Sequence, residues 1–244
     1  MSLRPYVHVD ARIEAAPAGT RVALSAGERH HLTRVLRLGP GAEVVVADGA
    51  GSHGPAELDG DALVLSAPAV TEPRPRPALE VAQALGKARK LDEVVRAVTE
   101  LGADRILPVT TARTVVRLEG ERADKAQVRW RSVARAACEQ ARRPYRPRID
   151  ALVPLEHAAT DGATVLVAHP GARPLPDHLA ALAAAAAVRI VIGPEGGWTD
   201  GELAALVADG ATAVGLGPTV LRTEHAAAAA LAVIGSAVGR WNGR

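Results

Sequence analysis

The sequence predicts a two-domain protein, in which a small all-β module precedes a larger α/β domain built on a parallel sheet. Three observations carry this prediction. Short apolar runs separated by Gly, Pro and Asp fill residues 1–70, three alternating prolines end the segment 71–77, and strand-like and helix-like patterns alternate through residues 78–244. Such alternation is typical of a parallel sheet with helices on both faces.

The N-terminal module reads as a small β-barrel. Its apolar, partly β-branched runs predict strands, at Tyr6–Val9, Arg21–Leu24, Glu43–Ala47 and Ala62–Leu65. One helical segment, Gly27–Arg37, interrupts them, and a Gly-Pro-Gly turn stops it. The proline-rich residues 71–77 then favour an extended, semi-rigid linker between the domains.

The second domain repeats the order strand then helix. We expect strands at Leu79–Leu85, Ile106–Val109, Thr164–Ala168, Val188–Ile192 and Thr212–Leu216. Apolar residues at helical spacing predict helices between them, near Ala88–Leu101, Ala123–Ala141, Asp177–Ala187, Asp200–Ala208 and Glu224–Val238. Gly102 fits the position just past a helix end.

Composition narrows the class of protein. Hydrophobic residues make up 48% of the chain and aromatic residues only 2%, so Ala, Val and Leu must fill the core. The single cysteine excludes a disulfide framework and a cysteine-based zinc site, and no cluster of metal ligands is visible. Without a signal-like start or an apolar run of about 20 residues, a cytoplasmic protein that does not cross a membrane is expected.

Charge is concentrated in the middle of the chain. Residues 86–148 carry 16 Lys or Arg against 8 Asp or Glu, although the whole chain has a net charge of only +2. A concentrated basic region favours nucleic acid, because contacts from Lys and Arg to phosphates drive that affinity. The alternative is a solvated helix face with no partner.

Two Gly-Pro loops carry the chemistry. Residues 192–197 read Ile-Gly-Pro-Glu-Gly-Gly, and residues 216–224 read Leu-Gly-Pro-Thr-Val-Leu-Arg-Thr-Glu. Each follows a short buried strand, and ligands of open α/β sheets bind at the carboxyl ends of strands. Thr199 with Glu202 predicts a capping box, and Thr223 is the expected N-cap of the last helix. The alternatives are a tight turn without a ligand and a surface ion pair between Arg222 and Glu224.

These two loops closely resemble the RsmE-type 16S ribosomal RNA uridine-N3 methyltransferases of the SPOUT superfamily. Further similarity lies in residues 29–41, which resemble the PUA-like RNA-binding domain of that family, and in Ala136-Ala-Cys-Glu-Gln140. The resemblance implies a trefoil-knotted, homodimeric enzyme that methylates a uridine of the 30S subunit with S-adenosylmethionine. It implies a cofactor site formed by His169, Pro170, Ile192, Gly193, Glu195, Gly196, Gly197, Leu216, Gly217, Val220, Leu221, Thr223 and Ala226.

The resemblance also suggests where RNA binds. Basic residues expected to contact it are Arg4, Arg34, Arg37, Lys87, Lys90, Arg142 and Arg143, whereas His31 is expected to pack under the barrel. The chain departs from the family after Gln140, where it reads Ala141-Arg-Arg-Pro144 and keeps only the arginine at Arg143. A second departure is His225, which follows Arg-Thr-Glu. Cys138 reads as a small packed residue rather than a nucleophile.

The catalytic step leaves two possibilities open. The neutral N3–H of uracil is a poor nucleophile, so either a general base removes the proton or a cation stabilises the developing oxyanion. Arg143 and Arg222 are candidates for the cation, and Glu195, Glu224 and Glu139 for the base. Rival functions are a nucleotide-using enzyme with small-molecule chemistry, a non-catalytic RNA-binding or assembly factor, and a knotted methyltransferase acting on ribose or tRNA.

Overall fold

The computed structural model describes residues 4–87, 89–159 and 161–241. The chain forms two compact units, of which the first comprises Met1–Arg74 with Cys138–Arg146 and the second Pro75–Ala137 with Pro147–Arg244. The first division thus falls within the predicted linker. The sequence did not predict that residues 138–146 pack with the N-terminal unit.

The N-terminal unit is a six-stranded sheet with strand order β1-β3-β4-β5-β2, in which β6 pairs with β4. β1 runs parallel to β3, whereas the other pairings are antiparallel. A continuous apolar cluster that includes Val7, Val44 and Leu63 forms its core. The strands are β1 (Tyr6–His8), β2 (Arg21–Ala23), β3 (Glu43–Ala47), β4 (Ser52–Asp59), β5 (Ala62–Leu65) and β6 (Val70–Thr71).

The predicted helix of this unit has two parts. Ser25 and Glu28 form a capping box at the start of α1 (Ala26–His30), which continues as the π-helical turn η1 (His31–Val35). His31 does not pack under the sheet as expected. Its side chain is 41% exposed and its Nε2 lies 3.5 Å from the Glu139 carboxylate, so that prediction was wrong.

Residues 138–146 join this unit through a glycine-dependent contact. Tyr145 forms a bridge to Ala50, and the amide N–H of Gly51 donates to the Pro144 carbonyl at 3.1 Å. A Cβ on Gly51 would lie 2.4 Å from the Tyr145 ring, and Gly51 has a φ of +114°. The glycine is therefore needed both for its backbone angle and for the space that Tyr145 fills.

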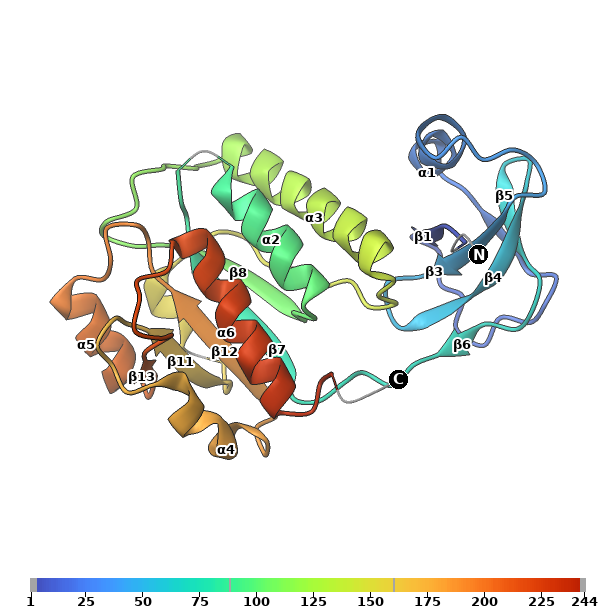
Figure 1. Cartoon of the computed structure of the whole chain (residues 1–244). Coiled ribbons are helices and arrows are strands. Elements are labelled where there is room, and N and C mark those ends of the chain that lie inside the picture. The colour runs from blue at the N-terminus through green and yellow to red at the C-terminus, as the bar shows by residue number, and fades with distance from the viewer. Residues whose placement is uncertain (1–3, 88, 160, 242–244) are drawn as a thin grey trace. The chain divides into compact units, whose positions relative to one another are not determined.

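The C-terminal unit holds a parallel seven-stranded sheet of order β10-β8-β7-β12-β11-β13, with β9 beside β8 (Figure 1). Its central strands are buried on both faces, as expected of parallel sheets covered by helices. They are β7 (Ala78–Ala84), β8 (Arg105–Thr110), β9 (Arg148–Ile149), β10 (Val153–Pro154), β11 (Thr164–Ala168), β12 (Ala187–Ile192) and β13 (Thr212–Val214).

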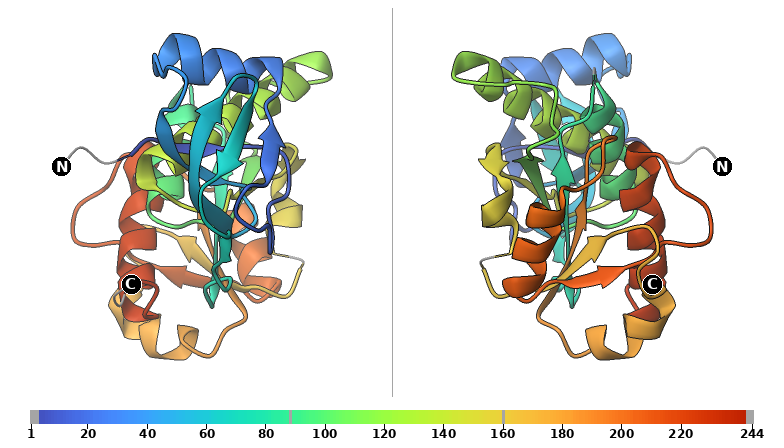
Figure 2. Two further views of the ribbon diagram at one scale, coloured as in Figure 1. Left: turned by 90° about the vertical axis from the view of Figure 1, so that its right-hand side faces the viewer. Right: turned by 90° about the vertical axis from the view of Figure 1, so that its left-hand side faces the viewer.

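Helices cover the two faces of this sheet unequally. One face packs against residues of α2 (Lys90–Glu100), α3 (Glu121–Ala141), α4 (Leu179–Leu182) and α6 (Thr223–Ala237). The other packs against α5 (Asp200–Ala208) and the 3-10 turn η2 (Leu155–Ala158). Figure 2 shows α5 and α6 on opposite sides of the sheet. A second 3-10 turn, η3 (Leu175–His178), precedes α4.

Several predicted boundaries needed correction. The helix expected at Asp177–Ala187 is only η3 and α4, because Leu175, Leu179 and Leu182 reach the core while the following alanines lead directly into β12. β13 ends at Val214, and α2 begins at Lys90, whereas the predicted start at Ala88 lies outside the described residues. The capping box of Thr199 and Glu202 is confirmed.

After the edge strand β13, the chain returns to the middle of the sheet. β13 pairs only with β11 among the strands described, yet α6 contacts β12, β7 and α2. This return carries residues 215–222 back over the carboxyl ends of the strands. The threading of the chain into a trefoil knot stays a prediction.

Candidate cofactor site

The first Gly-Pro loop is shaped by Trp198. A Cβ on Gly193 would lie 3.0 Å from the Trp198 ring, so a larger residue would push that ring away. The Trp198 Nε1 donates to the Ala168 carbonyl at 2.9 Å, which ties the loop after β12 to the end of β11. Gly197 has a φ of +71°, and its N–H closes a turn onto the Pro194 carbonyl. This role of Trp198 was not predicted from the sequence.

The loops after β11 and β13 also meet. The His169 N–H donates to the Val214 carbonyl at 3.0 Å, and the Leu175 N–H donates to the Gly215 carbonyl at 2.9 Å. A Cβ on Gly215 would lie 2.6 Å from the Ala172 carbonyl oxygen. This close approach of the two backbones therefore requires a glycine at position 215. The structure therefore brings together the loops in which the cofactor residues were predicted.

Exposed residues of the loop after β13 leave the site open to ligands. Val220 is 83% exposed and Leu221 is 36% exposed, although both are apolar. Pro170 and Gly217 are also exposed, whereas Leu216 is half-buried against the core. Exposed apolar side chains beside glycine-rich loops are typical of a binding surface.

The side chains of two predicted cofactor residues face the core. Ile192 is 2% exposed and Ala226 is 7% exposed, and both belong to the main apolar cluster. A contact of either residue with the cofactor would therefore be through its backbone, and that contact stays a prediction. Their side chains hold β12 and α6 in place under the loops.

Thr223 links the last helix to the first loop. It is the first residue of α6, and Arg222 is the N-cap, so the predicted capping role of Thr223 was wrong. Its hydroxyl donates to the Gly193 carbonyl at 2.6 Å and accepts from the Gln83 Nε2 at 3.1 Å. Gln83 is 1% exposed, and its Oε1 has no hydrogen-bond partner among the residues the structure describes. A buried acceptor of this kind fits a donor group on a bound ligand.

A lysine holds the two candidate carboxylates together. The Lys90 Nζ lies 3.2 Å from the Glu195 Oε1 and 3.1 Å from the Glu224 Oε2. The Lys87 N–H donates to Glu195 at 3.4 Å. Arg222 is 79% exposed, and its guanidinium lies only 3.9 Å from Glu224, so it is weakly engaged. Contacts of Lys87 and Lys90 with RNA stay predictions.

The charges of this cluster shift one another. Hydrogen bonds to Glu224 and then to Glu195 raise the pKa of Lys90. For Glu195, burial pushes the pKa upwards, but hydrogen bonds from its own backbone and from Lys90 outweigh it, and the pKa is lowered. The pKa of Glu224 is also lowered, mainly by its own backbone N–H and also by Lys90, against some desolvation. Both glutamates are therefore ionised and weakly basic.

Arg143 and its neighbours belong to the N-terminal unit. The Arg143 carbonyl lies 2.9 Å from the His8 Nε2, and the Arg142 guanidinium donates to the Arg4 carbonyl and lies 5.2 Å from the centre of the Tyr6 ring. The Glu139 carboxylate accepts from the His8 N–H at 3.0 Å. Engaged in this way, Glu139 is committed to holding the unit together.

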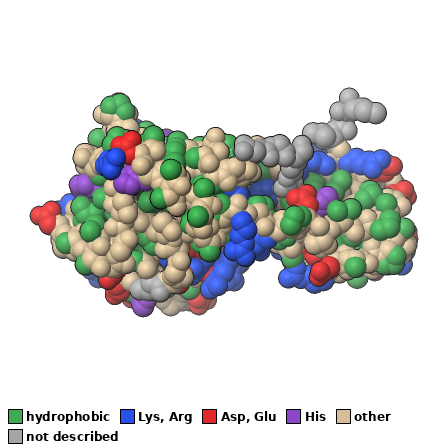
Figure 3. Space-filling view, turned by 90° about the horizontal axis from the view of Figure 1, so that it is seen from below, with side chains coloured by type: hydrophobic (Ala, Val, Ile, Leu, Met, Phe, Trp, Pro, Cys, Tyr) green, Lys and Arg blue, Asp and Glu red, His purple; other side chains and the backbone are tan. Residues whose placement is uncertain are grey.

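The other candidate RNA contacts of this unit differ in exposure. Arg34 and Arg37 are exposed, and Arg37 has a φ of +56°. Arg4 pairs with Glu43 at 2.8 Å. Figure 3 shows that Lys and Arg side chains gather on part of the face drawn there, whereas Asp and Glu are scattered.

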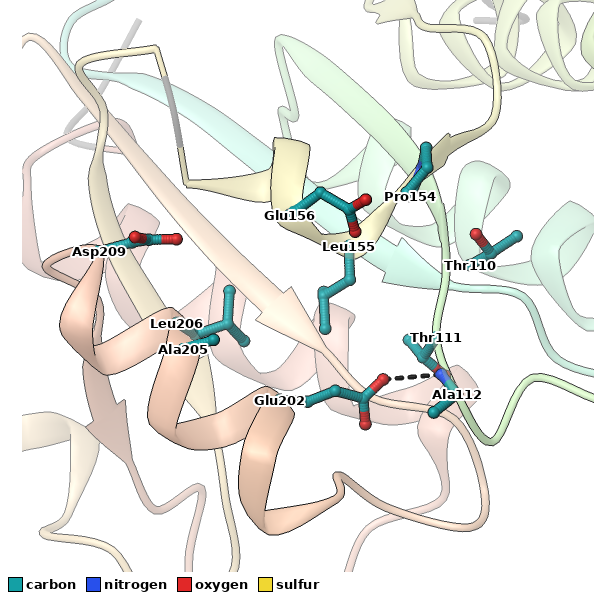
Figure 4. Close-up of a pocket in the computed structure, with 10 residues that line it drawn as sticks. All are labelled: Thr110, Thr111, Ala112, Pro154, Leu155, Glu156, Glu202, Ala205, Leu206 and Asp209. Carbon is teal, nitrogen blue, oxygen red and sulfur yellow. Dashed lines mark hydrogen bonds between the residues drawn. The ribbon is translucent and has the colours of Figure 1, made fainter.

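A separate cavity of about 310 Å³ lies between the end of β8 and α5 (Figure 4). Leu155 and Leu206 line it, and Glu202 accepts the Ala112 N–H there at 2.7 Å. None of the predicted cofactor residues lines this cavity. In the described ranges, no group of three or more His, Cys, Asp or Glu side chains is placed to hold a metal ion. Of the helices described, none is long and apolar enough to cross a membrane.

Comparison with known proteins shows the family of the chain. Residues 72–235 match the RNA methyltransferase domain family, and residues 24–66 match the RNA methyltransferase PUA domain. The Ribosomal RNA small subunit methyltransferase E of Mycobacterium bovis is 38% identical over 76% of this chain and 75% of that protein.

Two solved structures extend the likeness to three dimensions. One is a Neisseria gonorrhoeae Ribosomal RNA small subunit methyltransferase E bound to S-adenosyl methionine, with a TM-score of 0.83 and 26% identity over 96% of this chain and 97% of that one. The other is a Legionella pneumophila protein in complex with the bound cofactor SAM, with a TM-score of 0.84 and 28% identity over 97% and 98% of the two chains.

Proposed function

Because the chain belongs to the RNA methyltransferase family that includes the Ribosomal RNA small subunit methyltransferase E proteins, we propose that it methylates N3 of one uridine in 16S ribosomal RNA. The methyl donor is S-adenosylmethionine, whose sulfonium already activates the methyl carbon. The methyl group moves from sulfur to N3, the N3 proton leaves to a base or to water, and neutral S-adenosylhomocysteine departs.

The observation that supports this function best is the meeting of three glycine-containing loops at one edge of the sheet. Gly193 leaves no room for a side chain beside Trp198, and Gly215 lies against the Ala172 carbonyl. Backbone groups presented in this way read a flat purine ring without charges. The unpartnered Gln83 Oε1 adds an acceptor in the same region. These features fit an adenosine-containing cofactor.

For the chemical step we favour a cation over a carboxylate base. Glu195 and Glu224 both face Lys90, and the pKa of each is lowered, so they accept protons weakly. Arg222 lies next to them and keeps most of its donors exposed. A guanidinium there stabilises the negative charge that develops on a uracil oxygen as N3 loses its proton. Arg143 remains the second candidate for this role.

The partner is the RNA of the small ribosomal subunit, and the target uridine must be unpaired, because base pairing hides N3. The PUA domain and the basic middle of the chain are suited to hold flanking phosphates. A homodimer in the cytoplasm, acting on assembled 30S subunits, completes the proposal.

A methylation assay tests this function. Labelled S-adenosylmethionine is incubated with 30S subunits that lack the modification and with free 16S rRNA, and the labelled nucleoside is identified by mass. The expected product is N3-methyluridine, formed faster on 30S subunits. A 2′-O-methyl nucleoside or label only in tRNA would reject the assigned atom or substrate. Absence of both label and cofactor binding would favour a non-catalytic RNA-binding protein.

A further inference from the structure

The segment between β8 and α3 presents one exposed, positively charged face. Residues 113–119 alternate regularly, with Arg113, Val115 and Arg117 exposed and Thr114, Val116 and Leu118 half-buried. Such a period of two is typical of an extended chain with one face turned inward. Leu118 packs against the main apolar cluster, so the inner face anchors the segment.

The exposed face keeps a net positive charge and is not fully polar. Residues 113–119 include two arginines, Arg113 and Arg117, and one glutamate, Glu119, which follows them on the same exposed face. Val115, between the arginines, is 73% exposed. No ion pair of Arg117 occurs within the part of the chain that the structure describes. Two guanidinium groups flanking an apolar side chain suit a strand of RNA, whose phosphates alternate with ribose and base surfaces.

The start of the segment is tied to the candidate cofactor loop. The Arg113 guanidinium donates to the Gly196 carbonyl at 2.7 Å. The aliphatic part of the Arg113 side chain also packs on Gly196. A Cβ added to Gly196 would lie 3.4 Å from the Arg113 Cβ and 3.4 Å from the Arg113 Cδ. One residue earlier, the Ala112 N–H donates to Glu202, which also caps α5 (Figure 4). A ligand on this face is therefore held next to the Gly193–Gly197 loop.

We propose that Arg113, Val115 and Arg117 form a contact surface for the RNA strand that carries the target base. The inference rests on the proposed function and adds a surface on the catalytic unit itself. Arg117 contacts phosphate alone. Arg113 has two roles. One N–H of its guanidinium holds the Gly196 carbonyl, and its other N–H groups contact phosphate. Binding of RNA and of the cofactor should therefore be coupled through Arg113.

The test uses the full-length protein and separates RNA binding from cofactor binding. Affinity for a fluorescent single-stranded 16S rRNA fragment is measured at several salt concentrations, and affinity for S-adenosylmethionine is measured by calorimetry. The variants are Arg117→Ala, Arg113→Ala and Arg113→Lys. Lys125→Ala is the matched control, because Lys125 is 72% exposed on α3 and pairs only with Glu121 in the described structure. Thermal unfolding confirms that each variant is folded.

We expect Arg117→Ala to weaken RNA binding about 5-fold and to lower the slope of log K against log salt by about one, with unchanged cofactor affinity. Arg113→Ala should show the same loss and also bind the cofactor about 3-fold or more weakly, as expected when a hydrogen bond from a charged group is lost. Arg113→Lys should restore the salt slope.

Two results would overturn the inference. One is an unchanged RNA affinity and salt slope in both arginine variants. The other is an equal loss in Lys125→Ala, which would mean that any surface cation contributes. The RNA measurement needs no cofactor, so a wild-type protein that fails to bind S-adenosylmethionine would count against the proposed function and leave this test intact.

Discussion

Charged side chains lie at both ends of the strands of the parallel sheet, but they are buried at one end and reach solvent at the other. In the first half of the strands, Arg189 of β12 is fully buried and bonds Glu80 of β7, Asp161 and the Ala158 carbonyl. Glu80 lies in register between Arg189 and Arg105 of β8. At the other end, Lys90 is 30% exposed and Arg222 is 79% exposed, around loops rich in glycine.

This difference separates charges that are fixed inside the fold from charges that solvent reaches. Burying a charge costs several kcal/mol of desolvation, which its ion pairs and hydrogen bonds must offset. Arg189 and its partners are therefore held in one fixed arrangement. Charges at the loop end keep contact with solvent and remain available to a ligand. Substitutions at the first end should therefore damage folding, and those at the second should damage activity.

The largest effect is expected at the buried end. Arg189→Met removes the closest partner of Glu80 and one of the two arginines that pair with Asp161, the other being Arg105. Breaking a buried pair costs about 3–5 kcal/mol of unfolding free energy. Urea denaturation measures this loss. Arg173→Met is the control, because Arg173 is 71% exposed and pairs with Asp177 on the surface, where about 0.5 kcal/mol or less is expected. Equal effects of the two substitutions would contradict the comparison.

The next largest effect concerns catalysis at the loop end. Arg222→Ala should reduce kcat about 100-fold, the loss typical of removing one donor to a developing oxyanion. The free energy of unfolding should change by less than about 0.5 kcal/mol, since the side chain is 79% exposed. Single-turnover methylation of 30S subunits and urea denaturation provide the two measurements. Arg143→Ala tests the second candidate in the same assay. A wild-type rate in both variants would remove the cation from the mechanism.

A smaller effect is expected from acid. The pKa values of Glu195 and Glu224 are lowered from an ordinary value of 4.5, so their stabilisation is present above that pH and is lost as the pH falls through the lowered values. Lys90→Met removes a cation that lowers the pKa of both glutamates. The variant should therefore be less stable than the wild type at neutral pH but lose less stability as the pH falls below 4.5. Unfolding between pH 3 and 7 measures this difference, and superimposable acid limbs would argue against the ion cluster.

The smallest effect is expected at Cys138. Burial raises the pKa of this thiol to about 11, even though Arg143 and Arg146 act in the opposite direction. At pH 8 only about one thiol in a thousand is ionised. Iodoacetamide should therefore leave the native protein unmodified over a time in which the urea-unfolded protein reacts completely. Rapid native labelling would show that the residue is accessible and reactive.

Local sequence signals predicted most of the elements. β3, β5, β11 and α5 have the predicted bounds, because their apolar periods and caps are strong. β4 was missed, since Gly54 and Pro55 interrupt its pattern, although its burial alternates as a strand requires. The alanine run before β12 predicted a longer helix because alanine favours helices everywhere, whereas the short connection needs only one turn.

The site could be predicted only in part, because sequence shows loops but not what joins them. The Gly-Pro motifs predicted one edge of the sheet as the site, and the structure brings their loops together at that edge. Trp198, Gln83 and Arg113 were missed, because each acts through one contact with a residue distant in sequence, such as the bond from Trp198 to Ala168 or from Arg113 to Gly196. The assignment of residues 138–146 to the N-terminal unit also depends on such contacts.

The central claim is that the cofactor binds at the Gly193–Gly197 loop, and calorimetric titration with S-adenosylmethionine tests it most directly. In Gly193→Ala the new methyl group would meet the Trp198 ring at 3.0 Å, whereas in Gly201→Ala it would meet nothing within 4 Å. We predict saturable binding to the wild type and to Gly201→Ala, and at least about a 10-fold loss in folded Gly193→Ala, as when a ligand contact worth about 1.4 kcal/mol is removed. Wild-type affinity in Gly193→Ala would place the cofactor elsewhere.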